Sequence, residues 1–253
     1  MMRLPVCARR VWCRPGRSLL CVCRSVCLSN GPLKSMYYDP RSQKHGLRHS
    51  PVTALVVPRP IGWISTISPQ GIVNLAPYSF FNLVSGYPPW VIFASAPRKH
   101  SQVNAEATGE FVFNLATWDL REQMNASSAD YPPGVSEPEA VGLEMVPSRA
   151  VKPPRVKRSP VAIECKYFKT VELIGSDGRA NRSSIVIGEV VGIYIDDAVI
   201  VEGMIDITRM RPIARLGYMD YCAVDEFFTM PRPGETDPRA DAETAAVAPK
   251  GVD

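Results

Sequence analysis

The sequence predicts a mainly β protein whose strands form an antiparallel barrel with a few flanking helices. Proline accounts for 24 of the 253 residues, which argues against a helical bundle or a coiled coil because proline interrupts helices. Short apolar runs bounded by glycine and proline recur along the chain, as they do in proteins built from several short strands. The contents of 45% apolar and 21% charged residues are ordinary for a globular protein.

Seven segments have the alternating or β-branched apolar composition that is typical of strands. In chain order they are Ala54–Val57, Trp63–Ile67, Trp90–Ala94, Phe111–Leu115, Val161–Leu173, Ile185–Ile195 and Ala198–Val201. Their close spacing, with few helices between them, favours antiparallel pairing.

Two helices are expected among these strands. The first runs from about Gln102 to Thr108, with Ser101 as its N-cap and Gly109 just past its end. The second runs from near Trp118 to about Ser127 and has Thr117 as its cap. Residues 131–160 are a proline-rich connector with several basic side chains, which we expect to be a charged surface loop.

Composition divides the chain into three parts. Residues 1–35 carry a net charge of +7 and five of the seven cysteines, residues 36–230 carry −1, and residues 231–253 carry −2. We expect residues 1–35 to be an extension that is disordered or absent from the mature protein, with translation beginning at Met36; an arginine-rich transit peptide is the alternative. Residues 36–230 form the expected domain, and residues 231–253 the expected disordered tail.

Several classes of function are disfavoured. The near-neutral body lacks the basic surface that nucleic acids or anionic membranes attract. Its two cysteines, Cys165 and Cys222, make no disulfide framework, which favours a reducing compartment and hence the cytoplasm. The chain has no G-x-G dinucleotide fingerprint, no phosphate-binding P-loop and no G-x-S-x-G elbow. Because the chain has only three histidines, we expect neither a hydrolase nor a metal site.

The most informative stretch is uncharged. No charged residue occurs between Arg59 and Arg98, a run of 38 positions whose prolines exclude a membrane-spanning helix. Neutral hydrogen-bonding groups alternate there with aromatic and aliphatic ones, as in a wall that holds a flat uncharged ring. Arg98, Lys99 and the start of a helix then offer an anion site. A ring with a phosphate tail describes flavin mononucleotide (FMN); the alternative is a buried core with polar turns.

The same stretch resembles the flavin reductase-like family of FMN-binding split-barrel proteins, which includes flavoredoxin. The resemblance lies in several ordered blocks and covers residues 37–230. The blocks are Pro58–Thr66, Asn74–Asn82, Pro88–Pro89, Arg98–Ser101 with Asn104, Thr108–Asn114, Glu164–Lys166, Gly188–Val191 and Pro212–Tyr218.

The resemblance implies a Greek-key split barrel that forms a homodimer, with FMN near the subunit interface and NADH or NADPH as a transient hydride donor. It implies that Ser65, Thr66, Arg98, Ser101 and Asn104 contact the phosphate or the ribityl chain. Around the ring it implies Asn74, Ala76, Ser79, Phe80 and Asn82, with Arg215 and Tyr218 closing the pocket. Arg59 and Trp63, in the first block, complete the expected set. No catalytic residue is expected, because the flavin itself accepts the hydride.

Three functions follow from the resemblance. The first is an NAD(P)H:flavin oxidoreductase, with a two-component monooxygenase as a candidate partner. The second reduces ferric chelates or another acceptor, and the third binds FMN without catalysis. Two departures bear on them: His100-Ser101 stands where many relatives have Asp-Thr, and Tyr194 stands where many have His, which leaves use of a nicotinamide donor open.

Overall fold

Residues 35–132 and 134–235 are described by a computed structural model of the chain. The chain divides into two compact units at Gly46 and Leu47, and the fold below is that of the second. In the described part of the first unit, the Asp39 carboxylate accepts a hydrogen bond from the backbone of Arg41 at 3.0 Å. The expected extension 1–35 and the expected tail 231–253 lie outside the described residues, except for residue 35 and residues 231–235.

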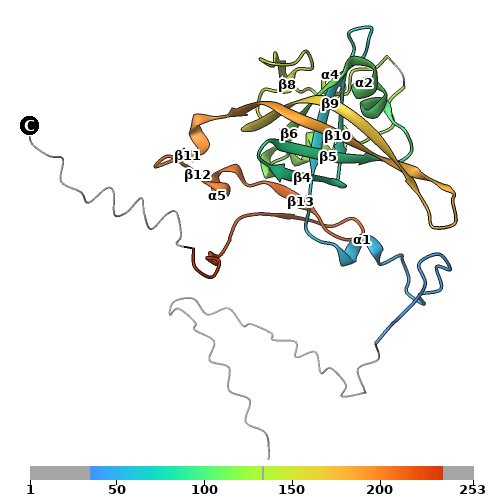
Figure 1. The fold of residues 1–253 in the computed structure, drawn as a ribbon. Coiled ribbons are helices and arrows are strands. Elements are labelled where there is room, and N and C mark those ends of the chain that lie inside the picture. The colour runs from blue at the N-terminus through green and yellow to red at the C-terminus, as the bar shows by residue number, and fades with distance from the viewer. Residues whose placement is uncertain (1–34, 133, 236–253) are drawn as a thin grey trace, which may run out of the picture. The chain divides into compact units, whose positions relative to one another are not determined.

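Seven strands form the main sheet of the second unit (Figure 1). Every pairing in it is antiparallel, and the spatial order is β3-β2-β6-β9-β10-β5-β4. The strands are β2 (Gly62–Ile67), β3 (Val73–Tyr78), β4 (Phe81–Gly86), β5 (Pro89–Ser95), β6 (Glu110–Leu115), β9 (Val161–Ile174) and β10 (Ala180–Ile195). The long β9–β10 hairpin forms the centre of the sheet.

The sheet closes on itself. Its two edge strands, β3 and β4, follow one another in the chain, and only Ser79 and Phe80 separate them. Three consecutive Cα–Cα steps reach at most about 11 Å. The sheet must therefore curl until its edges lie close together, which confirms the predicted antiparallel barrel.

Shorter elements surround the barrel. A three-stranded sheet contains β1 (Arg59–Pro60), β13 (Ile213–Arg215) and β14 (Tyr221–Ala223). Two strand pairs are β7 (Met145–Val146) with β8 (Arg155–Val156), and β11 (Ile200–Val201) with β12 (Met204–Ile205). The helices are α1 (Val52–Leu55), α2 (His100–Thr108), α3 (Arg121–Ala126), α4 (Glu137–Ala140) and α5 (Ile207–Met210), with 3₁₀ turns η1 (Trp118–Leu120) and η2 (Asp197–Val199).

Five of the predicted strands are confirmed, and two predictions were wrong in whole or part. Ala54–Val57 is not a strand: its first two residues belong to α1, which lies between Pro51 and Pro58. Leu55 and Val56 are both more than two-thirds exposed, so their apolar composition reflects no buried strand. In Ala198–Val201 only the last two residues are extended, because the Asp196 side chain accepts from Ala198 N and starts η2.

The two predicted helices exist with shifted ends. α2 begins two residues early, at His100, so Ser101 lies inside the helix and Lys99 occupies the N-cap position. Gly109 ends it as predicted, with a left-handed φ of 75°. The second helix is divided into η1 and α3; Thr117 stands at the predicted cap position but its side chain makes no capping hydrogen bond. The 131–160 connector is not a plain surface loop, because it contains α4, β7 and β8.

The barrel interior is aromatic and tightly packed. Phe93 and Phe111 are fully buried, and their ring centroids lie 5.4 Å apart in an edge-to-face arrangement. Gly188 on β10 provides the space for this pair, since a side chain there would overlap the Phe111 ring and approach Cys165 Cβ to 3.3 Å. A second apolar cluster packs on the other face of β2, against η1 and α3.

Replacing Gly188 by alanine is expected to lower the free energy of unfolding by about 1–3 kcal/mol, because the new methyl group overpacks a rigid core. Urea unfolding would measure the change. Gly86→Ala is the matched control on β4: apart from its chain neighbours, no atom lies within 4 Å of the place that the new methyl group would take, so stability should be unchanged or slightly raised. Equal stabilities for the two variants would contradict this packing of the barrel interior.

No helix among the described residues is long and apolar enough to cross a membrane. Cys165, which is buried, and Cys222 are free thiols.

Candidate functional site

A groove of three adjoining stretches runs along β3 and the β3–β4 link. The polar end is a pocket of about 440 Å³ at the start of α2. The middle stretch, of about 220 Å³, shares Ala76, Tyr78 and Lys99 with it. The apolar end, of about 520 Å³, shares Ser79 and Phe80 with the middle. The three stretches therefore adjoin, and their character changes from one end to the other.

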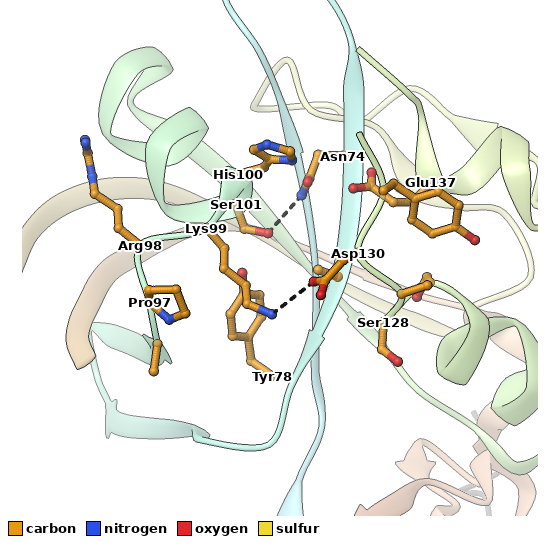
Figure 2. A pocket seen from close by; sticks show the side chains of 15 residues that line it. Asn74, Tyr78, Pro97, Arg98, Lys99, His100, Ser101, Ser128, Asp130 and Glu137 are labelled. Carbon is orange, nitrogen blue, oxygen red and sulfur yellow. Dashed lines mark hydrogen bonds and ion pairs between the residues drawn. The ribbon is translucent and has the colours of Figure 1, made fainter. Parts of the chain in front are cut away.

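The start of α2 makes the polar end favourable for anions. Lys99 is extended at the N-cap and α2 is nine residues long, so the first backbone N–H groups of the helix lack intrahelical partners. Lys99, His100 and Ser101 all line the pocket (Figure 2). Free N–H groups and the helix dipole both attract negative charge.

A buried hydroxyl without a partner also lies on this wall. Tyr78 is only 7% exposed, and its hydroxyl makes no hydrogen bond to any described residue. Burial raises the pKa of Tyr78 above its usual value, against the opposing effect of the nearby Ser101 and Ser95 hydroxyls, so the group stays a neutral O–H donor. A buried donor without a partner is costly, and because the oxygen itself is enclosed, a ligand oxygen would reach it only after a shift of the pocket wall.

Three more buried polar side chains form a row beside it. Asn74 Nδ2 donates to Ser101 Oγ at 2.8 Å, and Glu137 on α4 accepts from Leu75 N at 3.1 Å. Figure 2 shows Asn74 between Ser101 and Glu137. Burial raises the pKa of Glu137, an effect that the Leu75 N–H and the nearby His100 oppose.

The two cations of the polar end have different partners. Lys99 reaches across the pocket to the exposed Asp130, with 3.9 Å between Nζ and Oδ1 (Figure 2). Arg98 Nε donates to Glu106 at 3.1 Å. Burial alone would raise the pKa of Glu106, but hydrogen bonds from Gln102, Arg98 and Thr170 lower it below its usual value. Lys99 is thus the more available cation.

The apolar end is lined by aromatic and aliphatic side chains. Phe80 and Phe81 contribute rings, and Phe81 stacks on Phe113 with 4.6 Å between the centroids. Arg59 also lines this end, but its two terminal nitrogens are occupied: they donate to the carbonyls of Val56 at 2.7 Å and Leu216 at 2.9 Å, while the buried Nε makes no hydrogen bond to a described residue. Its Cζ lies 5.8 Å from the centre of the Phe80 ring.

The structure brings eight of the fourteen sequence-predicted residues to the groove. Lining it are Arg59, Asn74, Ala76, Ser79, Phe80, Asn82, Arg98 and Ser101. The other six, which do not line it, are Trp63, Ser65, Thr66, Asn104, Arg215 and Tyr218.

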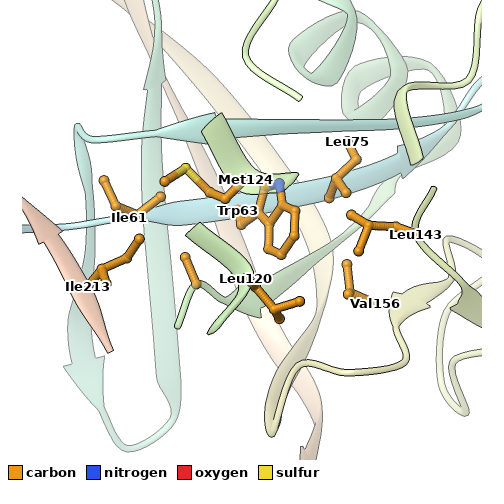
Figure 3. Close-up of a cluster of buried hydrophobic side chains, with 9 residues drawn as sticks. Ile61, Trp63, Leu75, Leu120, Met124, Leu143, Val156 and Ile213 are labelled. Atoms are coloured by element: carbon orange, nitrogen blue, oxygen red, sulfur yellow. The ribbon is translucent and has the colours of Figure 1, made fainter. Parts of the chain in front are cut away.

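Four of those six are buried structural groups. Trp63 is fully buried in the cluster on β2 (Figure 3), where its indole N–H donates to Ser127 Oγ at 2.9 Å. Ser65 is also fully buried and donates to the carbonyl of Pro154 at 2.6 Å, which fixes the connector to the barrel. Asn104 donates to Thr66 Oγ1 at 3.2 Å and joins α2 to β2. None of the four offers a free surface to a ligand.

The remaining two lie near the C-terminal strands. Arg215 lines a different cavity, of about 370 Å³, with Trp118 and Tyr221. Tyr218 lies edge-on to His49, with ring centroids 6.0 Å apart. Tyr194 stands where many relatives have His. The Cζ atom of Arg155 lies 3.5 Å from the centre of the Tyr194 ring, and Tyr194 lines a separate cavity.

Sequence reasoning missed several residues of the polar end. Tyr78 follows Asn74 and Ala76 at intervals of two, so strand alternation is a signal that could have found it. Glu137 and Asp130 come from the non-periodic segment after α3, where the sequence carries no signal that links them to β3. The described residues contain no group of three or more His, Cys, Asp or Glu side chains that could hold a metal ion.

The fold agrees with comparisons to solved structures. Nitrilotriacetate monooxygenase component B from Bacillus cereus is similar, with 28% identity, 78% of this chain and 99% of that chain covered, and a TM-score of 0.71. The 2-nitrobenzoate 2-nitroreductase NbaA of Pseudomonas fluorescens shares 30% identity over 74% of this chain and 90% of its own, with a TM-score of 0.64. A Shewanella frigidimarina protein with a split barrel domain shares 27% identity over 72% of this chain and 89% of its own, with a TM-score of 0.64.

Sequence comparison agrees. An uncharacterized protein of Aquifex aeolicus is 38% identical over 66% of this chain and 84% of its own length. The model of the flavin reductase like domain matches residues 54–213, a span that contains every groove residue named above. The chain therefore belongs to the flavin reductase-like family and has its split-barrel fold.

Proposed function

We propose that the chain binds FMN in the groove, with the phosphate at the start of α2 and the ring toward Phe80. The observation that carries the proposal is the change of character along the groove. One end has a helix N-terminus, Lys99 and the unpartnered Tyr78 hydroxyl, and the other has aromatic walls and few charges. These features fit a phosphate joined by a polar chain to a flat, largely apolar ring.

The residues have separate roles in this proposal. Tyr78 and Ser101 donate hydrogen bonds to phosphate oxygens. Lys99 leaves its long ion pair with Asp130 and pairs with the phosphate instead. Ser79 and Asn82 provide polar groups around the ring, while Phe80 and Phe81 exclude water from one side. When bound, FMN supplies a ring that accepts hydride.

The activity that we propose is NAD(P)H-dependent flavin reduction. The support is membership of the flavin reductase-like family, together with a structural relative that is a monooxygenase component. A second component, a monooxygenase, is accordingly the partner that we propose for this chain. The finer choice between NADH and NADPH rests on experiment.

Absorbance of the purified full chain would test the proposal. We expect added FMN to bind, and NADH or NADPH to bleach the bound flavin under anaerobic conditions. Bound FMN that stays oxidised with both donors would reject the reductase and leave a flavin-binding protein. A chain that binds no FMN would reject the proposal altogether.

We also propose that the chain is a homodimer. Leu83 and Val84 on β4 and Ile193 on β10 are each more than half exposed, and a second copy would bury such apolar side chains. Light scattering coupled to size-exclusion chromatography should give twice the chain mass, and a monomer at micromolar concentration would contradict this.

A further inference from the structure

The carboxyl group of Glu137 is joined to the proposed phosphate site through one amide. Asn74 lies between Glu137 and Ser101, and all three side chains are buried. As placed, Asn74 Nδ2 donates to Ser101 Oγ at 2.8 Å. The Asn74 oxygen then faces Glu137 Oε1 at 3.0 Å, a contact between two acceptors unless Glu137 carries a proton.

Turning the amide by 180° reverses the hydrogen bond between Asn74 and Ser101 and leaves the one from Leu75 N to Glu137 in place. The amide nitrogen then donates to Glu137 Oε1 at 3.0 Å, and the amide oxygen accepts from Ser101 Oγ at 2.8 Å and Leu75 N at 3.2 Å. This orientation suits an ionised Glu137. The first suits a protonated Glu137 at the Oε1 contact, although it places Asn74 Nδ2 3.2 Å from Leu75 N, a contact between two donors. The two orientations therefore differ in the direction in which the Ser101 hydroxyl points.

We propose that Glu137 is a positioning residue that couples anion binding to proton uptake through Asn74 and Ser101. With Glu137 protonated, Asn74 donates to Ser101, and the Ser101 hydrogen is free to donate into the pocket. With Glu137 ionised, that hydrogen is held by Asn74, and Ser101 presents only lone pairs to the ligand. A phosphate thus binds tightly only to the protonated form. This inference rests on the proposed placement of the FMN phosphate.

Several charged or titratable groups face the same pocket. They are Arg98, Lys99 and His100 at the start of α2, Tyr78 on β3, Asp130 and Tyr131 after α3, and Ser101 within the row; on α4 itself Glu139 is exposed. Burial raises the pKa of Glu137 and so favours its protonated form. His100 needs its own control because it lines the same pocket.

The two forms of Glu137 set the direction in which FMN affinity changes with pH. Because the bound state favours protonated Glu137, FMN affinity should fall as the pH rises through the pKa of Glu137 in the free protein. Full coupling corresponds to a loss of about tenfold per pH unit above that pKa. The phosphate of FMN titrates near pH 6 and contributes an opposite trend, but this contribution is common to all variants.

Calorimetric titration of the full chain with FMN and with riboflavin, at pH 6–8.5 in buffers of different ionisation enthalpy, would test the coupling. The quantity to compare is the number of protons taken up for each FMN bound. At a pH above the pKa of Glu137, this number should be larger by close to one in the unaltered chain than in the Glu137→Gln variant. The glutamine amide donates to the Asn74 oxygen as the protonated acid does, so this variant should bind FMN at pH 8 at least as tightly as the unaltered chain.

Three controls separate this relay from other effects. Glu139→Gln should leave proton uptake unchanged, and His100→Asn should leave the difference due to Glu137 in place. Ser101→Ala should abolish the proton uptake due to Glu137, although Glu137 remains. If that uptake persists in Ser101→Ala, simple repulsion between the Glu137 carboxylate and the phosphate explains it, and the coupling through Asn74 and Ser101 is overturned. Riboflavin should show no proton uptake linked to Glu137. FMN binding with equal proton uptake in the unaltered chain and Glu137→Gln would reject this inference alone; no FMN binding would reject the proposed function.

Discussion

Trp63→Ala is expected to lower the free energy of unfolding by about 3–5 kcal/mol, the cost of removing a large aromatic side chain from a core. The indole is fully buried among Leu75, Leu120 and Met124, and rigid neighbours on β3, η1 and α3 leave little scope for collapse (Figure 3). Its partner Ser127 keeps a hydrogen bond to the Met124 carbonyl at 2.8 Å, so the loss is chiefly one of packing. Denaturant unfolding at constant FMN concentration would measure it.

Trp118→Ala is the matched control. That ring is 40% exposed and stacks with the guanidinium groups of Arg121 at 4.1 Å and Arg211 at 5.4 Å. At exposed sites each such contact contributes about 0.5–1 kcal/mol, so the total loss should stay below about 2 kcal/mol. The milder Trp63→Phe variant should fold and bind FMN within about twofold of the unaltered chain. A large loss of FMN affinity in that variant would restore Trp63 to the ligand site.

Lys99→Ala is expected to weaken FMN binding by about 10- to 150-fold while changing riboflavin binding by less than about twofold. The range corresponds to about 1.5–3 kcal/mol for a charge-assisted hydrogen bond to the phosphate, which riboflavin lacks. Arg98→Ala should cost less, because Glu106 already holds its guanidinium. Fluorescence titration with FMN and riboflavin would measure the affinities of both variants. Added salt should reduce the extra loss of affinity for FMN relative to riboflavin.

Lys157→Ala supplies the control for loss of a positive charge. Lys157 pairs with Glu144 at 2.7 Å on the connector and does not line the groove. Its removal should leave both affinities unchanged. Equal weakening of FMN and riboflavin in Lys99→Ala would show that the phosphate lies elsewhere.

Much of the fold was predictable because its core strands are rich in β-branched and aromatic residues. Trp63–Ile67 and Phe111–Leu115 are buried on both faces, and their short length and their β-branched and aromatic residues favour strands over helices. The edge strands β3 and β4 are absent from the predicted set, because Pro77 and Gly86 weaken their local signal. Proline is tolerated in β3 because it is an edge strand, a fact that only the assembled sheet reveals.

The same property limited prediction of the site. Since β2 is buried on both faces, its sequence does not tell which of Trp63, Ser65 and Thr66 faces a ligand; in the structure none of them lines the groove. The residues predicted on β3 and the link after it, Asn74, Ala76, Ser79 and Phe80, all line the groove, and their contact with FMN stays a prediction. Glu137 depends on how a proline-rich connector folds back onto β3, and no local pattern encodes that return.

The two-residue link between β3 and β4 constrains how this protein can vary. Ser79 and Phe80 both bridge the seam of the barrel and form part of the groove wall. An inserted residue in this link would move β3 and β4 apart and would also shift the groove wall. The turn after β9, at residues 175–179, belongs to neither the seam nor the wall, so an insertion there would have neither effect. Changes in ligand preference at this wall are therefore open to exchange of side chains but closed to changes in loop length.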